Sequence, residues 1–190
     1  MEEKELKLRM YFFTIYQLTG MQSGIQCGHA SLEYARKFGT TDLFKEFVNE
    51  HKTWIILNGG TTNDERDFEG IVQGTLNQIG DQLHENDIQF SFFREPDLNH
   101  ALTALCFIID ERVFNHKDYP DFVNWLTDIK MYDKAKDEAN KNNPELWVKL
   151  RLYPELQQEI FPEYYKEWVR FIGGIKNVFL RDLISDKKLA

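Results

Sequence analysis

The segment 8–18, which reads LRMYFFTIYQL, constrains the fold more than any other part of the chain. Aromatic and β-branched residues dominate it, and both of its alternating faces are apolar. Such a pattern is typical of a strand that is buried on both sides, because a strand with one solvated face alternates apolar and polar residues. We therefore expect a sheet that is covered by helices on both faces.

After this strand the spacing of apolar residues becomes helical, and later in the chain it returns to the spacing of strands. Residues 22–38 have helical spacing, with Ile25, Leu32 and Ala35 near one face and several small residues that allow close packing on a sheet. A second short helix follows over 43–48, and then strands and helices alternate. The expected later elements are a strand at 53–57, a helix from Phe68 to Leu83, and strands at 88–93 and 102–110. This order predicts an α/β domain over residues 1–115, with a small mixed sheet of about four strands and helices on both faces.

Residues 116–190 have a different character. A short helix is expected at 119–126, and the charged segment 127–143 is either a solvated helix or a linker. Aromatic residues return after Leu146, and prolines that can open helices punctuate this part. We expect a helical, aromatic-rich C-terminal extension. Its aromatic side chains either complete a core or form an interface with a partner, and the sequence leaves both readings open.

Charge and composition limit the class of function. The formal net charge is -8, which weighs against broad nucleic-acid binding through Lys and Arg, although it leaves room for local contacts with an RNA end. No apolar run approaches the length of a membrane span, and the first residues lack the layout of a signal peptide, so we expect a cytoplasmic protein that binds no membrane. The two cysteines, Cys27 and Cys106, form no motif for zinc.

The first candidate for chemistry is the helix that follows the first strand. Gln22, Gln26, His29 and Glu33 fall at i, i+4, i+7 and i+11, so one face of the helix carries two amides, an imidazole and a carboxylate. This row follows the carboxyl end of a central strand, where open α/β sheets place their ligands. The alternative is an ordinary solvated helix face.

The second candidate is the polar connection between the last two strands. It combines both signs of charge with turn-forming residues, and loops held between rigid strands often carry function. The alternative is a plain hairpin connection. The residues concerned are Arg94, Glu95, Asp97, Asn99, His100 and, at the start of the next strand, Thr103.

Other catalytic patterns find no support. Residues 58–63 contain two glycines but no Gly-Lys-Ser/Thr, so they are interpreted as the exit of a strand. No G-x-S-x-G elbow is present for a serine nucleophile. Cys27 and His29 are two residues apart on one helix, so their side chains point apart.

Residues 8–114 resemble the type 2 peptidyl-tRNA hydrolases, the form typical of archaea and eukaryotes. The resemblance lies in the order of elements and in Gln26-Cys27-Gly28-His29-Ala30 after the first strand, with Trp54 near the second strand. Glu95 and Thr103 fall nearest to the family's acidic turn residue and to the Ser or Thr of its last strand. Two departures stand out: Gln22 takes the place of a Lys, and Glu95 begins a stretch where the family has Asp-Ala-Gly-x-Thr-Gln.

The resemblance implies hydrolysis of the ester between a peptide and the tRNA 3′ ribose, without a metal or an organic cofactor. The implied catalytic residues are His29, Glu95, Asp97 and Thr103. The implied substrate-binding residues are Gln22, Gln26, Arg94, Asn99 and His100. A tRNA or nucleotide is the implied ligand, and a homodimer is left open. Two other hypotheses stand beside this one: a binding module on the same fold without hydrolysis, and an interaction protein that works through its aromatic tail.

Overall fold

The computed structural model describes residues 5–64, 73–128, 148–149, 153 and 155–190. The chain divides into two compact units, one made of residues 1–111 and 182–190 and the other of residues 112–181. The first turns of the helix expected from Phe68, and most of the charged segment 127–143, lie outside the described residues.

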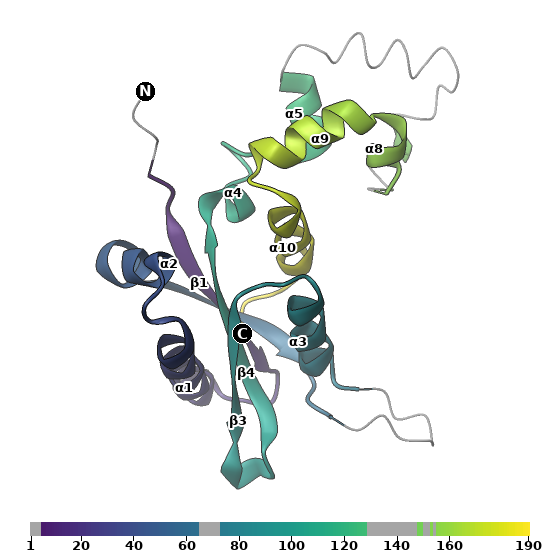
Figure 1. The fold of residues 1–190 in the computed structure, drawn as a ribbon. Coiled ribbons are helices and arrows are strands. Elements are labelled where there is room, and N and C mark those ends of the chain that lie inside the picture. The colour runs from purple at the N-terminus through teal and green to yellow at the C-terminus, as the bar shows by residue number, and fades with distance from the viewer. Residues whose placement is uncertain (1–4, 65–72, 129–147, 150–152, 154) are drawn as a thin grey trace. The chain divides into compact units, whose positions relative to one another are not determined.

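The first unit is built on a four-stranded mixed sheet, which confirms the expected fold class (Figure 1). The strands are β1 Leu8–Ile15, β2 Thr53–Gly60, β3 Phe90–Glu95 and β4 Ala101–Asp110, in the spatial order β2-β1-β4-β3. β1 pairs with β2 in parallel, whereas β4 is antiparallel to both β1 and β3. The most apolar strands, β1 and β4, therefore occupy the centre, where both of their faces are covered.

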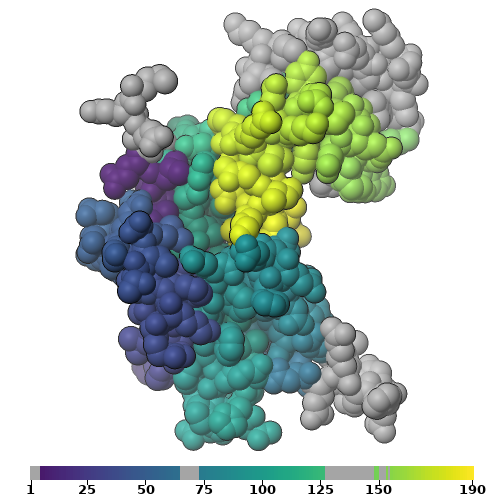
Figure 2. Space-filling model, viewed as in Figure 1, coloured from purple at the N-terminus to yellow at the C-terminus, as the bar shows by residue number. Residues whose placement is uncertain are grey.

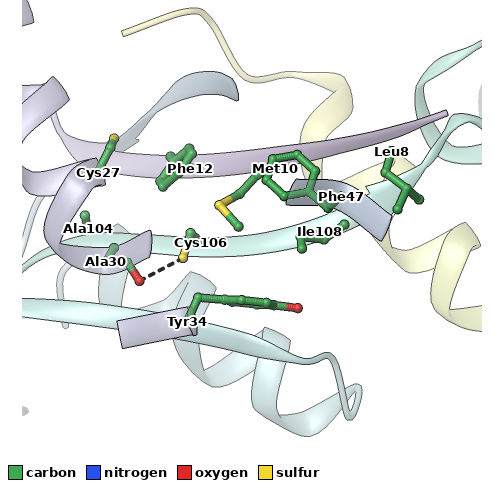
Figure 3. Packing of buried hydrophobic residues seen from close by; sticks show 10 residues of the cluster. All are labelled: Leu8, Met10, Phe12, Cys27, Ala30, Tyr34, Phe47, Ala104, Cys106 and Ile108. Atoms are coloured by element: carbon green, nitrogen blue, oxygen red, sulfur yellow. Dashed lines mark hydrogen bonds between the residues drawn. The ribbon is translucent and has the colours of Figure 1, made fainter. Parts of the chain in front are cut away.

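Helices cover both faces of this sheet. On β4, Cys106 contacts helix α1 (Gly20–Phe38), because its Sγ lies 3.3 Å from the Ala30 carbonyl oxygen (Figure 3). The neighbouring Leu105 faces helix α3 (Thr75–Glu85), at the position of Gly80. Adjacent residues of a strand point to opposite faces, so α1 and α3 lie on opposite sides. The cluster on the α1 side contains Leu8, Met10, Phe12, Cys27, Ala30, Tyr34, Phe47, Ala104, Cys106 and Ile108.

The face of α1 that packs on the sheet is not the one that carries Ile25 and Leu32. These two side chains are 52% and 69% exposed, whereas Cys27 and Ala30 are fully buried. Small side chains let the helix backbone come close to β4, which a Leu or Ile at these positions would prevent. The apolar residues with the clearest periodicity in the sequence therefore lie on the outer side of the helix.

A short helix, α2 (Asp42–Glu46), follows α1 and continues as one turn of π-helix, Phe47–His51. The turn ends at Lys52, whose φ of 55° is left-handed. A π-helical turn was not expected from the sequence. It places Phe47 in the core on the α1 side of the sheet.

The C-terminal residues belong to the first unit, although they were expected to be part of the extension. The outer edge of β2 receives them: the Asn58 amide donates to the Lys188 carbonyl at 2.9 Å, and the Ala190 amide donates to the Ile56 carbonyl at 3.0 Å. Leu57 and Leu189 form an antiparallel bridge between these bonds. This pairing covers an edge that would otherwise expose unpaired backbone groups.

The second unit is helical. It contains α5 (Phe122–Asp128), α8 (Glu155–Ile160) and α9 (Pro162–Phe171), while α4 (Glu111–Phe114) and α10 (Ile175–Ser185) run across its two boundaries. Its aromatic residues form a core of their own, which favours the packing reading over a wholly exposed interface. The buried members are Phe122, Val123, Trp125, Leu126, Phe161, Trp168, Ile172 and Val178.

Two buried side chains fix this second core through hydrogen bonds. The Trp168 indole Nε1 donates to the Pro120 carbonyl at 3.0 Å. Arg181 is only 4% exposed and donates to the Arg112 carbonyl at 2.7 Å and to Asp121 at 2.5 Å. Buried donors of this kind need partners, and here they have them. No helix in the described part of the chain is both long enough and apolar enough to span a bilayer.

Candidate functional site

Gln26 holds two residues of the sheet with its side-chain amide. Its Nε2 donates to the Glu95 Oε2 at 2.7 Å, and its Oε1 accepts from the Thr103 hydroxyl at 2.6 Å. A carboxylate only accepts, so the contact with Glu95 fixes which end of the amide is the nitrogen. Gln26 is 7% exposed and Thr103 is fully buried, while Glu95 is half-buried. The three residues, which we call the Gln26 network, join α1 to both strands of the β3–β4 hairpin.

A β-bulge in the β3–β4 hairpin turns the Thr103 side chain towards this network. Phe93 pairs with Ala104 and Arg94 pairs with Leu102, so Thr103 is an extra residue opposite the Phe93–Arg94 step. Such a β-bulge breaks the alternation of side chains and turns one of them to a new side. Thr103 therefore points to the α1 face, as Ala104 does, while Leu102 lines a cavity on the α3 face.

His29 lies beside the network, where α1 meets β3. Its ring stacks on Phe93, with the ring centroids 4.4 Å apart and the planes at 21°. The imidazole is exposed, and neither of its nitrogens hydrogen bonds to any residue that the structure describes. Within the same described set, the Glu95 Oε1 also has no hydrogen-bond partner. A carboxylate oxygen and an imidazole are therefore both available to a ligand on this face.

Gln22 is occupied in capping the helix. Its side-chain oxygen accepts from the Thr19 backbone amide and from the Thr19 hydroxyl, both at 3.0 Å. The Gln22 backbone amide in turn donates to the Thr19 hydroxyl at 3.3 Å. This reciprocal arrangement is a capping box, which explains why α1 begins at Gly20. Further along the same face, Glu33 is paired with Arg36 at 2.7 Å. Of the predicted row of polar residues, Gln26 alone joins the network and His29 lies next to it.

Arg94 lies on the opposite face of the sheet from Glu95. Its guanidinium makes two bonds to the Asp64 carboxylate, at 2.5 and 3.0 Å, and a third to the His100 carbonyl at 3.1 Å. The Arg94 guanidinium holds the pKa of Asp64 below its usual value, and Asn77 adds a further hydrogen bond to that carboxylate. Glu95 and Arg94 are neighbours in a strand, so their side chains must diverge. Arg94 therefore supplies no cation beside Glu95 in the Gln26 network.

Arg94 instead borders a cavity of about 300 Å³ between β3 and α3. Its lining includes Asp64, Asn77, His84, Phe92 and Leu105. Asp64 and Asn77 were not singled out from the sequence, since their partners are 13 to 30 residues away and no local pattern marks them. Asp64 accepts hydrogen bonds from Asn77 in α3 and from Arg94 in β3, so it links the end of β3 to the start of α3.

The tip of the hairpin carries the remaining predicted residues. Pro96–Leu98 form a short 3-10 turn, and Asn99 and His100 follow in the left-handed region, with φ of 54° and 57°. Figure 2 shows this tip, in teal, protruding at the lower end of the view. Asp97, Asn99 and His100 are exposed, and no described hydrogen bond joins them to the Gln26 network. The structure therefore does not assemble them with Glu95.

The loop after β2 is closed onto α3, as its interpretation as a strand exit implied. The Thr75 hydroxyl donates to the Gly59 carbonyl at 2.8 Å and accepts from the Thr61 amide at 2.9 Å. The Asn77 side-chain oxygen accepts from the Asn63 amide at 3.0 Å. These backbone amides are already used, so they do not form an open cradle for phosphate.

The cysteines are buried and free, and neither suits nucleophilic chemistry. Burial raises the pKa of Cys27 to about 12 and also raises the pKa of Cys106, so both thiols stay protonated near neutral pH. Among the described residues, one group of three side chains has metal-ligating atoms within 4.8 Å of one another: Glu5, Glu46 and His51. None of these three belongs to the Gln26 network.

No protein-family model matches the chain, and a search of curated proteins found no match.

Proposed function

We propose that the first unit is an ester hydrolase of the peptidyl-tRNA hydrolase type, with Glu95 as its general base. The observation that supports this most is the Gln26 network, in which a buried amide holds a half-buried carboxylate by one oxygen and leaves the other available. A general base must be held in place and must be accessible to water. Gln26 holds one oxygen of Glu95, and the other has no hydrogen-bond partner among the described residues.

The proposed reaction uses water as its only co-reactant. Glu95 takes a proton from water as the hydroxide adds to the ester carbonyl carbon, and the carbonyl π electrons move to the oxygen. The tetrahedral intermediate then collapses, the bond to the ribose 3′ oxygen breaks, and the proton from Glu95 passes to that oxygen. The exposed His29 imidazole lies on the same face and can hydrogen bond to the ribose or the carbonyl oxygen. Gln26 and Thr103 act as positioning residues, and no metal or organic cofactor is called for.

A tRNA substrate must be held locally in this proposal, because the net charge of -8 opposes a wide phosphate footprint. The function would place the protein in the cytoplasm, where translation occurs. Whether the active species is a monomer or a homodimer can be read from its mass in solution by light scattering. Contacts limited to the acceptor end predict a shallow dependence of KM on salt concentration.

The test is single-turnover hydrolysis of N-acetylated aminoacyl-tRNA by the full chain at high enzyme concentration. We expect release of the acylated amino acid, and a loss of at least about 100-fold in rate for Glu95→Gln, the lower end of the usual contribution of a general base. Glu85→Gln is the matched control, since Glu85 is an exposed carboxylate at the end of α3. Lack of turnover by folded protein, or equal rates for the two variants, would reject the proposal.

A second candidate is a binding module that holds a nucleotide or an RNA end on the same face without hydrolysing it. Two observations favour it: Gln22, which takes the place of the family's Lys, is used in the capping box, and Arg94 lies on the opposite face. Neither residue therefore supplies a cation near Glu95 that could stabilise the negative oxygen of the tetrahedral intermediate. Thermal-shift measurements with tRNA and with mononucleotides test this candidate, which predicts a raised melting temperature in the wild type and in Glu95→Gln alike.

A further inference from the structure

An apolar groove lies between α1 and the helical segment that follows it. Its volume is about 490 Å³, and side chains from α1, α2, the π-helical turn and the start of β2 line it. The lining residues that matter here are Leu32, Ala35, Phe44, Val48, Lys52 and Trp54. In Figure 2 the surfaces of α1 and α2, in dark blue and blue, lie next to each other. A concave, mostly apolar volume of this size is in the range of small-molecule sites.

The groove has apolar side chains that the fold does not cover. Leu32 is 69% exposed and Trp54 is 43% exposed. The Trp54 ring packs on Phe12, with ring centroids 4.7 Å apart, so the core holds it in place while much of its surface stays in water. A ligand that fills the groove would remove apolar surface from water without requiring the protein to reorder these residues.

One cation stands at this groove. Lys52 is the only charged residue among its described lining residues. Its backbone amide donates to the Phe47 carbonyl at 3.1 Å and closes the π-helical turn, which fixes the start of its side chain. Its ammonium has no ion-pair or hydrogen-bond partner among the residues described, and the side chain is exposed. Any polar head group that reaches Lys52 is therefore favoured if it is an anion.

We propose that this groove binds a linear amphipathic carboxylate of medium chain length, with the hydrocarbon chain against Leu32, Phe44 and Trp54 and the carboxylate on Lys52. The site lies outside the Gln26 network, and the proposal does not rest on ester hydrolysis. A free fatty acid and an acyl chain with another anionic head share this chemistry. A peptide helix would instead need a longer groove and several anchor residues.

The test is isothermal titration of the full chain with hexanoate, octanoate and decanoate, each below its micelle concentration. We expect the Kd to tighten by about two- to four-fold for each added CH₂ group, as the transfer of hydrocarbon predicts. If any anionic head group is enough, decyl sulfate should bind as tightly as decanoate. If the site requires a carboxylate, decanoate should bind and decyl sulfate should not. Either result supports the site. Decyltrimethylammonium should bind at least about tenfold more weakly.

Variants locate the binding. Lys52→Gln should weaken decanoate by about two- to fivefold but leave 1-decanol unchanged, and Leu32→Ser should weaken both. Both positions are exposed, so the fold should tolerate the changes. Lys45→Gln, at an exposed lysine of α2 that pairs with Asp42, is the control and should change neither. The proposal is overturned if no saturable binding occurs, if the cationic ligand binds as well as decanoate, or if Lys52→Gln behaves like the control.

Discussion

The Gln26 amide donates to Glu95 at 2.7 Å across 69 residues of chain, which ties the first helix of the domain to the end of its edge strand. The same amide accepts from Thr103, so one side chain holds both strands of the β3–β4 hairpin. The network therefore has two roles that experiments can separate. It stabilises the packing of α1 on the hairpin, and it positions the carboxylate that we propose as the base.

Replacing Gln26 with Leu should destabilise the first unit. The change removes the hydrogen-bond partner of the half-buried Glu95 carboxylate and the closer partner of the Thr103 hydroxyl, which keeps its contact with the Phe93 carbonyl at 3.3 Å. Leaving a buried polar group without its partner costs about 1–3 kcal/mol. Urea unfolding followed by circular dichroism measures the loss. Gln82→Leu, at an exposed Gln on α3, is the control and should change the free energy of unfolding by no more than about 0.5 kcal/mol. Equal stabilities of the two variants would contradict the structural role.

Replacing Gln26 with Glu should make stability depend on pH in a new way. Two carboxylates would then face each other at the 2.7 Å contact, and mutual repulsion raises the folded-state pKa of such a pair above the unfolded value of about 4.3. A raised carboxyl pKa means that the folded state binds more protons, so the penalty exists above that pKa and fades as pH falls towards about 4. Unfolding by urea at pH 7 and pH 4, compared with the wild type, should show the difference shrinking. A difference that does not change with pH would mean that the residues are not in contact.

The central part of the fold could be predicted from the sequence because its signals are local. The strand β1 is apolar on both faces, which identified it as a buried strand, and the helical spacing expected from Gln22 begins within two residues of the observed start of α1 at Gly20. The outward orientation of Ile25 and Leu32 could not be predicted. Periodicity finds an apolar face but does not say whether the sheet takes that face or a neighbouring one with smaller residues.

The site was predictable only in part, for a related reason. Gln26, Glu95 and Thr103 were all named as candidates, and the structure brings them together. Arg94 was expected with them, yet strand alternation places it on the other face. The β-bulge that turns Thr103 towards α1 leaves no mark in the sequence of either strand, because it depends on how the two strands pair. The same holds for the C-terminal residues, whose polar sequence gives no sign of strand pairing.

In the second unit, Asp121 should make stability sensitive to acid. His116, and then Arg181, hold the pKa of Asp121 at about 2 against the opposing effect of burial. A depressed carboxyl pKa contributes stability above the unfolded value of about 3.9, and the contribution is lost as pH falls from there to about 2. Asp121→Asn should therefore be less stable than the wild type at pH 7 and should lose less stability between pH 4 and pH 2. The Asp121 side chain is 62% exposed, so solvent screening limits the effect to about 1 kcal/mol.

Asp186→Asn is the control for this measurement, since Asp186 is an exposed carboxylate just after α10. Its acid profile should follow the wild type. If Asp121→Asn also follows the wild type through this pH range, the contacts with His116 and Arg181 do not contribute to stability in solution.

Removing residues 187–190 should expose the outer edge of β2. The Asn58 amide would lose its bond to the Lys188 carbonyl, and hydrogen exchange at Asn58 should accelerate by at least about tenfold. The Tyr16 amide, which donates to the Gly60 carbonyl at 2.9 Å, should keep its protection and so shows that the sheet is intact. Leu189→Ala separates the two contributions of the segment: its side chain is 75% exposed, so this variant should keep Asn58 protected through the backbone bonds. Exchange at Asn58 that is as slow in the truncated chain as in the wild type would show that the C-terminal residues do not pair with β2 in solution.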